Sequence, residues 1–150
     1  MSKPRALAGA FTATLVVAAG CSGQGNVFSL EPGTCFDDSG TADGTDAGQE
    51  LVSDVDVVDC AGPHFNEVFA TFDIDRDEYP GPAETLTLAD DGCLERFGAF
   101  VGTDYATSEL VLLYFVPTEQ GWSNGDREVI CYLFAGSLER IQGSARGSRR

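Results

Sequence analysis

The chain has 150 residues, enough for one domain with a single modest hydrophobic core, which argues against a second independent domain. All 24 acidic residues fall in residues 31–139, where only three arginines oppose them, so this body has a formal charge of −21. Such a field repels phosphate backbones, which argues against nucleic-acid binding, and it favours solubility and cationic partners.

Residues 1–20 predict a signal peptide. Lys3 and Arg5 precede residues 6–19, an uncharged run that is too short to span a bilayer but typical of a signal-peptide core. Small residues then lead into Cys21, and this arrangement resembles a bacterial lipobox, in which the cysteine is acylated and becomes the first mature residue. Ala18 stands where such motifs usually have leucine, so an ordinary secretory signal is the alternative. We expect acylated Cys21 to anchor the protein in the bilayer, at the extracytoplasmic face of the cell membrane.

Two further segments are expected to be solvated. Residues 21–33 are interpreted as a lipidated polar tether, because Gly, Ser, Gln and Asn bury too little apolar surface to order a chain. Residues 37–50 form an acidic, Gly-rich loop. A calcium site is an alternative for this loop, although the spacing of its candidate ligands matches no calcium-binding loop; these are Asp37, Asp38, Asp43 and Asp46.

Four cysteines remain after Cys21, at positions 35, 60, 93 and 131. An even number in an oxidising compartment predicts two disulfides, with three possible connectivities. We favour Cys35–Cys60, which closes a loop over the acidic stretch, and Cys93–Cys131, which ties a helix to a late strand. A zinc site made from Cys60, His64, Cys93 and Cys131 is the alternative, but no pair has the C-x2-C spacing typical of zinc ligands.

Alternating apolar and polar residues predict strands on both sides of the only histidine. A short strand is expected at residues 35–36. In residues 51–60, valines fall on one face and aspartates on the other until the pattern breaks near Cys60, which indicates a bulge or burial of both faces. After a turn at Gly62-Pro63, apolar residues recur with period two across residues 68–74, which predicts a second strand.

An acidic turn follows this second strand. Asp73, Asp75, Asp77 and Glu84 imitate ligand positions of an EF-hand loop. Glu78 stands where that loop needs glycine, and Pro80 and Pro82 restrict a backbone that must wrap the ion. We therefore interpret the segment as a turn, with calcium binding as the alternative.

One main helix is predicted from Pro82 to the residue before Gly102. Gly92 and Gly98 weaken it, so packing must hold it. Its expected buried face consists of six apolar residues at spacings of three and four, namely Ala89, Cys93, Leu94, Phe97, Phe100 and Val101.

Two strong strands end the domain. Residues 110–116 are an unbroken apolar run, predicted to be the central strand, and residues 128–134 alternate as the last strand. The expected fold is therefore α+β, a small antiparallel sheet packed on one main helix and stapled by two disulfides, over residues 34–136. Residues 137–150 are Gly- and Ser-rich with four arginines and are expected to form a basic flexible tail.

Several motifs together resemble the septum formation family of actinobacterial envelope proteins. They are G-x-C-F at 33–36, V-V-D-C-A-x-P-H-x-x-E-V at 57–68, Tyr79-Pro80-Gly81, F-x-x-[FY]-V-G at 97–102 and P-T-x-x-x-W-x-x-G-D-R-x-V-x-C at 117–131. The resemblance covers about residues 33–148. It implies a connection with division-septum formation and exported lipoprotein or membrane-anchored forms, and it does not imply any enzymatic activity.

The candidate binding residues are His64, Glu67, Trp122, Asp126 and Arg127. We expect His64 and Glu67 to brace the turn after Cys60, because a disulfide sulfur cannot serve as a nucleophile beside the imidazole. Trp122 is either a recognition anchor or a cap on the core. Asp126 and Arg127 are expected to fix a hairpin, with Arg127 paired to a carboxylate.

Two function classes follow. The first is a non-catalytic envelope module, without cofactor or metal, that binds an envelope or division protein or a cell-wall polymer. The second is an envelope enzyme or a calcium-dependent binding module that uses the His64–Glu67 turn and the acidic loops.

Overall fold

The computed structural model describes residues 23–38 and 54–150. The predicted signal peptide and Cys21 lie outside the described residues, as do Asp43, Asp46 and most of the acidic loop. Within the described residues, no helix is long and apolar enough to cross a bilayer.

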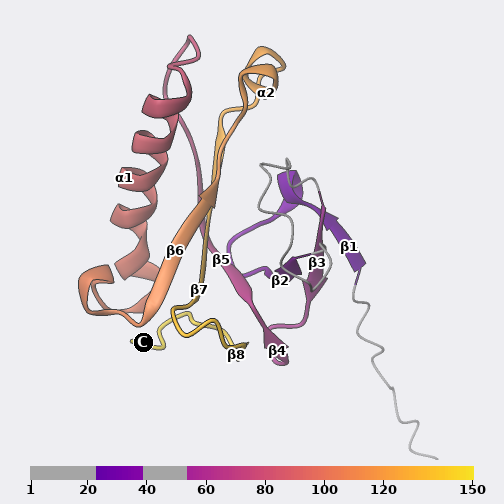
Figure 1. Cartoon of the computed structure of the whole chain (residues 1–150), viewed down its shortest axis with the longest axis vertical. Coiled ribbons are helices and arrows are strands. Elements are labelled where there is room, and N and C mark those ends of the chain that lie inside the picture. The colour runs from indigo at the N-terminus through magenta and orange to yellow at the C-terminus, as the bar shows by residue number, and fades with distance from the viewer. Residues whose placement is uncertain (1–22, 39–53) are drawn as a thin grey trace, which may run out of the picture.

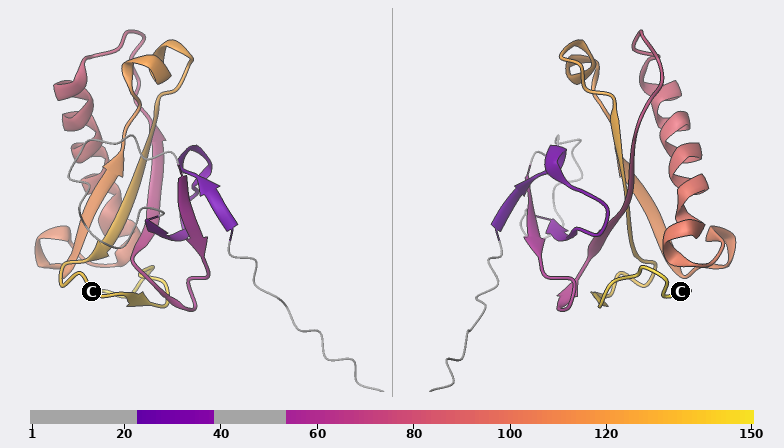
Figure 2. Two further views of the ribbon diagram at one scale, coloured as in Figure 1. Left: turned by 45° about the vertical axis from the view of Figure 1, so that its right-hand side comes forward. Right: turned by 180° about the vertical axis from the view of Figure 1, so that it is seen from behind.

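The fold is α+β, as predicted, with a six-stranded antiparallel sheet in the order β1-β3-β2-β5-β7-β6 and a separate pair, β4-β8. The strands are β1 Gly23–Asn26, β2 Cys35–Asp38, β3 Asp54–Val58, β4 Pro63–His64, β5 Asn66–Asp73, β6 Leu110–Phe115, β7 Glu128–Ala135 and β8 Ile141–Gln142. The helices are α1 Pro82–Val101 and α2 Glu119–Ser123, and two 3-10 turns are η1 Val27–Ser29 and η2 Tyr105–Thr107. Helix α1 lies on one side of β5, β7 and β6, whereas β1, β2 and β3 lie on the other side (Figures 1 and 2).

Helix α1 has the predicted bounds. Gly102 ends it in the left-handed conformation with φ 85°, and its amide donates to Gly98 O. A Cβ on Gly92 would lie 2.2 Å from the Phe72 ring, so glycine at this position allows the ring to pack directly on the helix. The predicted face is buried except for Leu94, which is 45% exposed, and Thr85 is buried as well.

Strand β5 separates two hydrophobic cores. Val68 belongs to a core with Phe36 and Val55, whereas Phe69 and Ala70 both belong to the core under α1. The register of β5 against β7 shifts between Val68 and Ala70, and this bulge points two consecutive side chains to the same core. The predicted simple alternation is therefore wrong in the first half of β5, where both faces are buried.

The apolar run 110–116 forms an edge strand, not the central strand. Strand β6 pairs only with β7 among the described strands. Leu110 and Leu112 are buried, but Leu113 is 45% exposed. An apolar run on both faces of a strand is typical of a central strand, which is why the sequence favoured that position. In the structure, only one edge of β6 is hydrogen-bonded to another described strand.

The predicted tether is shorter than expected. Strand β1 pairs with β3 from Gly23 onward, and Val27 and Leu30 are each only 3% exposed because they join the core that contains Phe36. Strand pairing and two buried apolar residues therefore dock this Gly- and Ser-rich segment on the domain.

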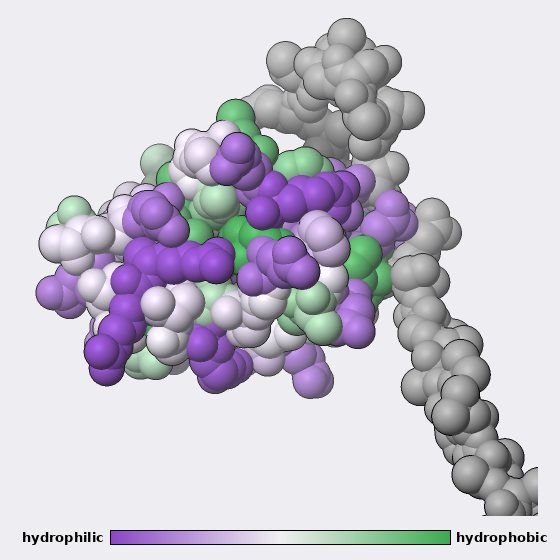
Figure 3. Space-filling model, turned by 90° about the horizontal axis from the view of Figure 1, so that it is seen from below, coloured by the Kyte–Doolittle hydropathy of each residue, from purple (hydrophilic) through white to green (hydrophobic). Residues whose placement is uncertain are grey.

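The predicted flexible tail is also wrong. Residues 137–150, which we call the C-terminal strap, pass under the end of the sheet and of α1 (Figure 1). Ile141 and Ala145 are almost completely buried, and β8 pairs with β4. Backbone amides of Gly147 and Arg149 donate to carbonyls at the end of α1, Phe100 O at 2.8 Å and Val101 O at 2.9 Å. Figure 3 looks at this end and shows long hydrophilic side chains around small hydrophobic patches.

Both favoured disulfides are present. Cys35 is joined to Cys60, and Cys93 on α1 is joined to Cys131 on β7. Cys93 and Cys131 are completely buried, so the second disulfide lies in the middle of the core under α1.

Candidate functional site

His64 is enclosed in the turn that follows Cys60. The turn is held by Gly62 N–H donating to Asp59 O at 2.9 Å, and β4 places the imidazole with no exposed surface. Its Nδ1 lies 2.9 Å from Gly62 O, and because a carbonyl only accepts, Nδ1 carries the proton. Nε2 is buried and has no hydrogen-bond partner among the described residues. This is the backbone-carbonyl geometry expected of a brace.

Glu67 binds the C-terminal strap, so the expectation that it braces the turn after Cys60 is wrong. Its side chain has no exposed surface. Ser144 Oγ donates to Oε1 at 2.5 Å and the Ala145 amide donates to Oε2 at 2.6 Å. Two short hydrogen bonds to one carboxylate compensate part of the cost of burying it. The strap is therefore attached to β5 by a buried polar contact.

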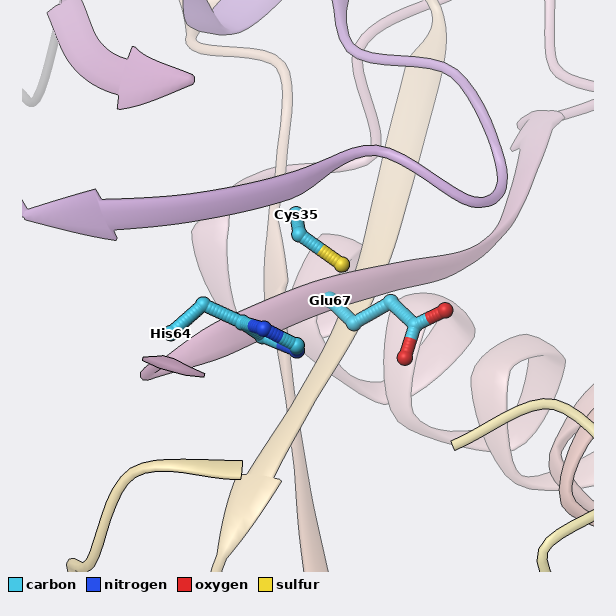
Figure 4. A group of neighbouring side chains, drawn as sticks. All are labelled: Cys35, His64 and Glu67. Atoms are coloured by element: carbon cyan, nitrogen blue, oxygen red, sulfur yellow. The ribbon is translucent and has the colours of Figure 1, made fainter. Parts of the chain in front are cut away.

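Glu67 also lies beside Cys35 and His64 (Figure 4), and the potential ligand atoms of these three residues are all within 4.8 Å of one another. The group does not fit a metal well. Cys35 Sγ is bonded to Cys60 and offers no thiolate, while both Glu67 oxygens already accept hydrogen bonds. The alternative zinc site fails for the same reason, since all its cysteines are consumed in disulfides.

The candidate calcium ligands have other partners or stay apart. Asp37 accepts from Arg140 Nη1 at 2.7 Å and from the Phe65 amide at 2.8 Å, which ties β2 to the strap and to the histidine turn. Glu84 pairs with Arg76 at 3.8 Å. Within the described parts of the chain, the Cys35 group is the only set of three or more potential ligands, so Asp73, Asp75 and Asp77 do not converge with Glu84.

Trp122 caps the core at the other end of the molecule, where α2 lies far from β4 (Figure 1). It is 5% exposed, and its Nε1 donates to Asp77 O at 3.3 Å. The Arg127 guanidinium stacks 3.8 Å from its ring centroid. The cap interpretation is therefore supported over the recognition anchor.

Asp126 and Arg127 fix the hairpin through backbone groups. The Glu128 amide donates to Asp126 Oδ1 at 3.0 Å, and Arg127 donates to Trp122 O at 2.7 Å and to Asp126 O at 2.9 Å. In the structure as described, no carboxylate forms an ion pair with Arg127, so the expected pairing is wrong. Both carbonyls accept from Nη1 of the guanidinium while its plane stacks on the indole.

A surface groove was missed from the sequence. It has a volume of about 320 Å³ and crosses the sheet face opposite α1, with Leu113, Phe134, Leu138 and Phe65 as its main apolar lining. Tyr132 lies in its floor, where burial and then the charge of Asp38 raise the pKa of Tyr132 to about 12. The one sequence feature that could have indicated this groove is the uncharged apolar run 110–116, which the sequence predicts to be the central strand.

Comparisons with known proteins agree with the family motifs found in the sequence. The family model described as septum formation matches residues 22–148. Two relatives from Mycobacterium tuberculosis, uncharacterized membrane protein MT3943 of strain CDC 1551 / Oshkosh and uncharacterized membrane protein Rv3835 of strain H37Rv, are each 32% identical over 118 residues. The match covers 73% of this chain but 26% of each relative, so the chain spans about a quarter of their length. No solved structure matches the chain. The family match extends over almost all of the folded domain, and the chain belongs to the septum formation family.

Proposed function

We propose that this protein is an exported lipoprotein, anchored at the extracytoplasmic face of the cell membrane through acylated Cys21. Its domain is a non-catalytic module that binds a division protein or a cell-wall polymer during septum formation. Family membership supports the link to septum formation, and the relatives carry the name of membrane proteins.

The burial of His64 is the observation that carries the non-catalytic part of the proposal. It is the chain's only histidine, it has no exposed surface, and its Nδ1 is engaged with Gly62 O. A general base must reach the proton that it removes, and an enclosed imidazole does not reach a substrate. The neighbouring Glu67 is equally enclosed and already binds the strap.

The position of β1 supports close attachment to the membrane. Gly23 begins β1, and only Ser22 separates it from Cys21. An acylated Cys21 would therefore hold the folded domain directly at the bilayer surface. A partner would be met within the first few nanometres outside the membrane, on the order of the reach of one small domain.

Mass spectrometry of the mature N-terminal peptide tests the anchor. We expect Cys21 to be the first residue and to carry acyl chains, and Cys21→Ser to release the protein from the membrane fraction. An unmodified Cys21 peptide together with full membrane retention of the variant would refute the lipid anchor.

Cross-linking in dividing cells then tests whether the module binds a partner at the septum. We expect recovery of a septal protein or polymer.

A calcium- or zinc-dependent module is the second candidate, because Cys35, His64 and Glu67 cluster, but the Cys35–Cys60 disulfide and the two hydrogen bonds to Glu67 leave only His64 Nε2 without a partner in this group. The non-catalytic proposal predicts that neither ion changes the melting temperature. A rise that saturates with either ion would favour the metal-dependent alternative.

A further inference from the structure

We propose that the free edge of β6, with the groove beside it, binds an extended segment of a partner protein that carries alternating apolar and basic side chains. This inference rests on the proposed function, because it names the surface and the chemistry by which the module would hold a protein partner.

Among the described residues, most of the edge of β6 lacks the features that usually protect such strands. Edge strands expose unpaired backbone groups, and proteins commonly block them with charges, proline or a covering segment. Residues 110–115 contain neither charge nor proline, and among the described strands β6 pairs only with β7. The Leu110 amide already donates to Ser108 Oγ at 3.0 Å, and the rest of this apolar edge, up to Phe115, is suited to the addition of a strand from a partner.

The sheet face beside this edge is also apolar. Leu113 pairs with Tyr132, and Val111 pairs with Phe134, so these four side chains stand on the same face, opposite α1. The exposed fractions are 45% for Leu113 and 71% for Leu138, and both residues line the groove. Alternate side chains of an added strand would point into this groove.

The negative charge around the groove favours a basic partner. Asp38 and Glu139 line the groove and are exposed, and Glu109 is exposed just before β6. The nearby Arg140 guanidinium is already held by Asp37 at 2.7 Å and by Pro63 O at 3.1 Å. Since the surrounding body is strongly acidic, a basic segment is attracted, whereas a second copy of this chain is repelled.

A titration with two peptides tests the proposal. The probes are end-blocked peptides of about eight residues, a usual strand length, one alternating valine with lysine and the other valine with glutamate. We expect the valine–lysine peptide to shift the amide resonances of residues 110–115, and the valine–glutamate peptide to leave them unchanged. Unchanged β6 resonances with both peptides would overturn the proposal.

Two variants and one control variant locate the site. Leu113→Lys should weaken binding of the valine–lysine peptide about tenfold or more, whereas Leu94→Lys should not, although Leu94 on α1 is also 45% exposed. Glu139→Gln, which changes charge with little change in shape, should weaken the same peptide and leave the melting temperature unchanged. Equal loss in the two lysine variants would contradict the β6 site.

Analytical ultracentrifugation distinguishes a second copy as the occupant. We expect a monomer. A dimer that Leu113→Lys converts to a monomer would show that the edge is occupied by another copy, and would overturn the choice of partner. None of these measurements depends on Cys21 or on septal location, so failure here is distinguishable from failure of the proposed function.

Discussion

The region around α1 and the end of the molecule closed by the strap are held in different ways. Under α1, Phe69, Phe97 and Phe100 pack with the buried Cys93–Cys131 disulfide in a large apolar cluster. At the strap end, hydrogen bonds from the strap to Glu67 and an ion pair between Arg140 and Asp37 join segments far apart in the sequence. Apolar packing is redundant, whereas a buried polar contact fails when one partner is lost.

The largest expected effect comes from removing the disulfide under α1. Cys93→Ala/Cys131→Ala should lower the free energy of unfolding by about 2–5 kcal/mol, because it frees the unfolded chain and leaves space in a packed core. Urea unfolding measures it. Cys35→Ala/Cys60→Ala is the matched variant and should cost less, since Cys60 is only half-buried. A larger loss in Cys35→Ala/Cys60→Ala would contradict the conclusion that the disulfide under α1 contributes more to stability.

Glu67→Ala should come next, at about 1–3 kcal/mol, because it leaves the buried Ala145 amide without its acceptor. The strap should also become sensitive to trypsin at Arg140 and Arg146, while the body stays intact. Glu67→Gln should recover part of the loss, since the amide oxygen replaces only one of two acceptors. Trypsin resistance equal to wild type in Glu67→Ala would mean that other contacts are sufficient to hold the strap.

His64→Ala should lower stability by about 1–3 kcal/mol through a cavity and the loss of the bond to Gly62 O. His64→Asn should recover more than His64→Gln, because the asparagine amide nitrogen is the closer substitute for Nδ1. Thermal melting of the three variants measures this order. Recovery by glutamine instead would place the important contact at Nε2.

The smallest expected effect is at Glu128, where burial and then the charges of Asp73 and Asp126 raise the carboxyl pKa. A raised folded-state pKa means that the folded protein binds more protons than the unfolded chain, so stability falls as pH rises through this pKa. Glu128→Gln should therefore stabilise at neutral pH, by about 0.5 kcal/mol or less, and the gain should vanish at acidic pH. A gain that persists at acidic pH would require another cause.

The same contrast explains what the sequence could predict. The bounds of α1 and the apolar strands followed from periodicity and from proline and glycine positions. The cysteine count predicted two disulfides but left three connectivities, and the favoured pairing is the one present. The docking of the strap could not be predicted, because it depends on hydrogen bonds from Ser144 and Ala145 to Glu67. These partners are separated from Glu67 by 77 and 78 positions in the sequence, and no periodic pattern indicates such a contact. The edge position of β6 was not predicted for a related reason. Apolar residues indicate that the faces of a strand are buried, but they carry no information about the order of strands in the sheet.

Hydrogen exchange in wild type and Glu67→Ala tests most directly whether the two regions are held independently. The account predicts that the variant loses protection at the amides of Ala145, Gly147 and Arg149, while the amides of α1 and β7 keep most of theirs. A uniform loss of protection across the strap, α1 and β7 would contradict it, because the strap and the helix core would then open as one unit.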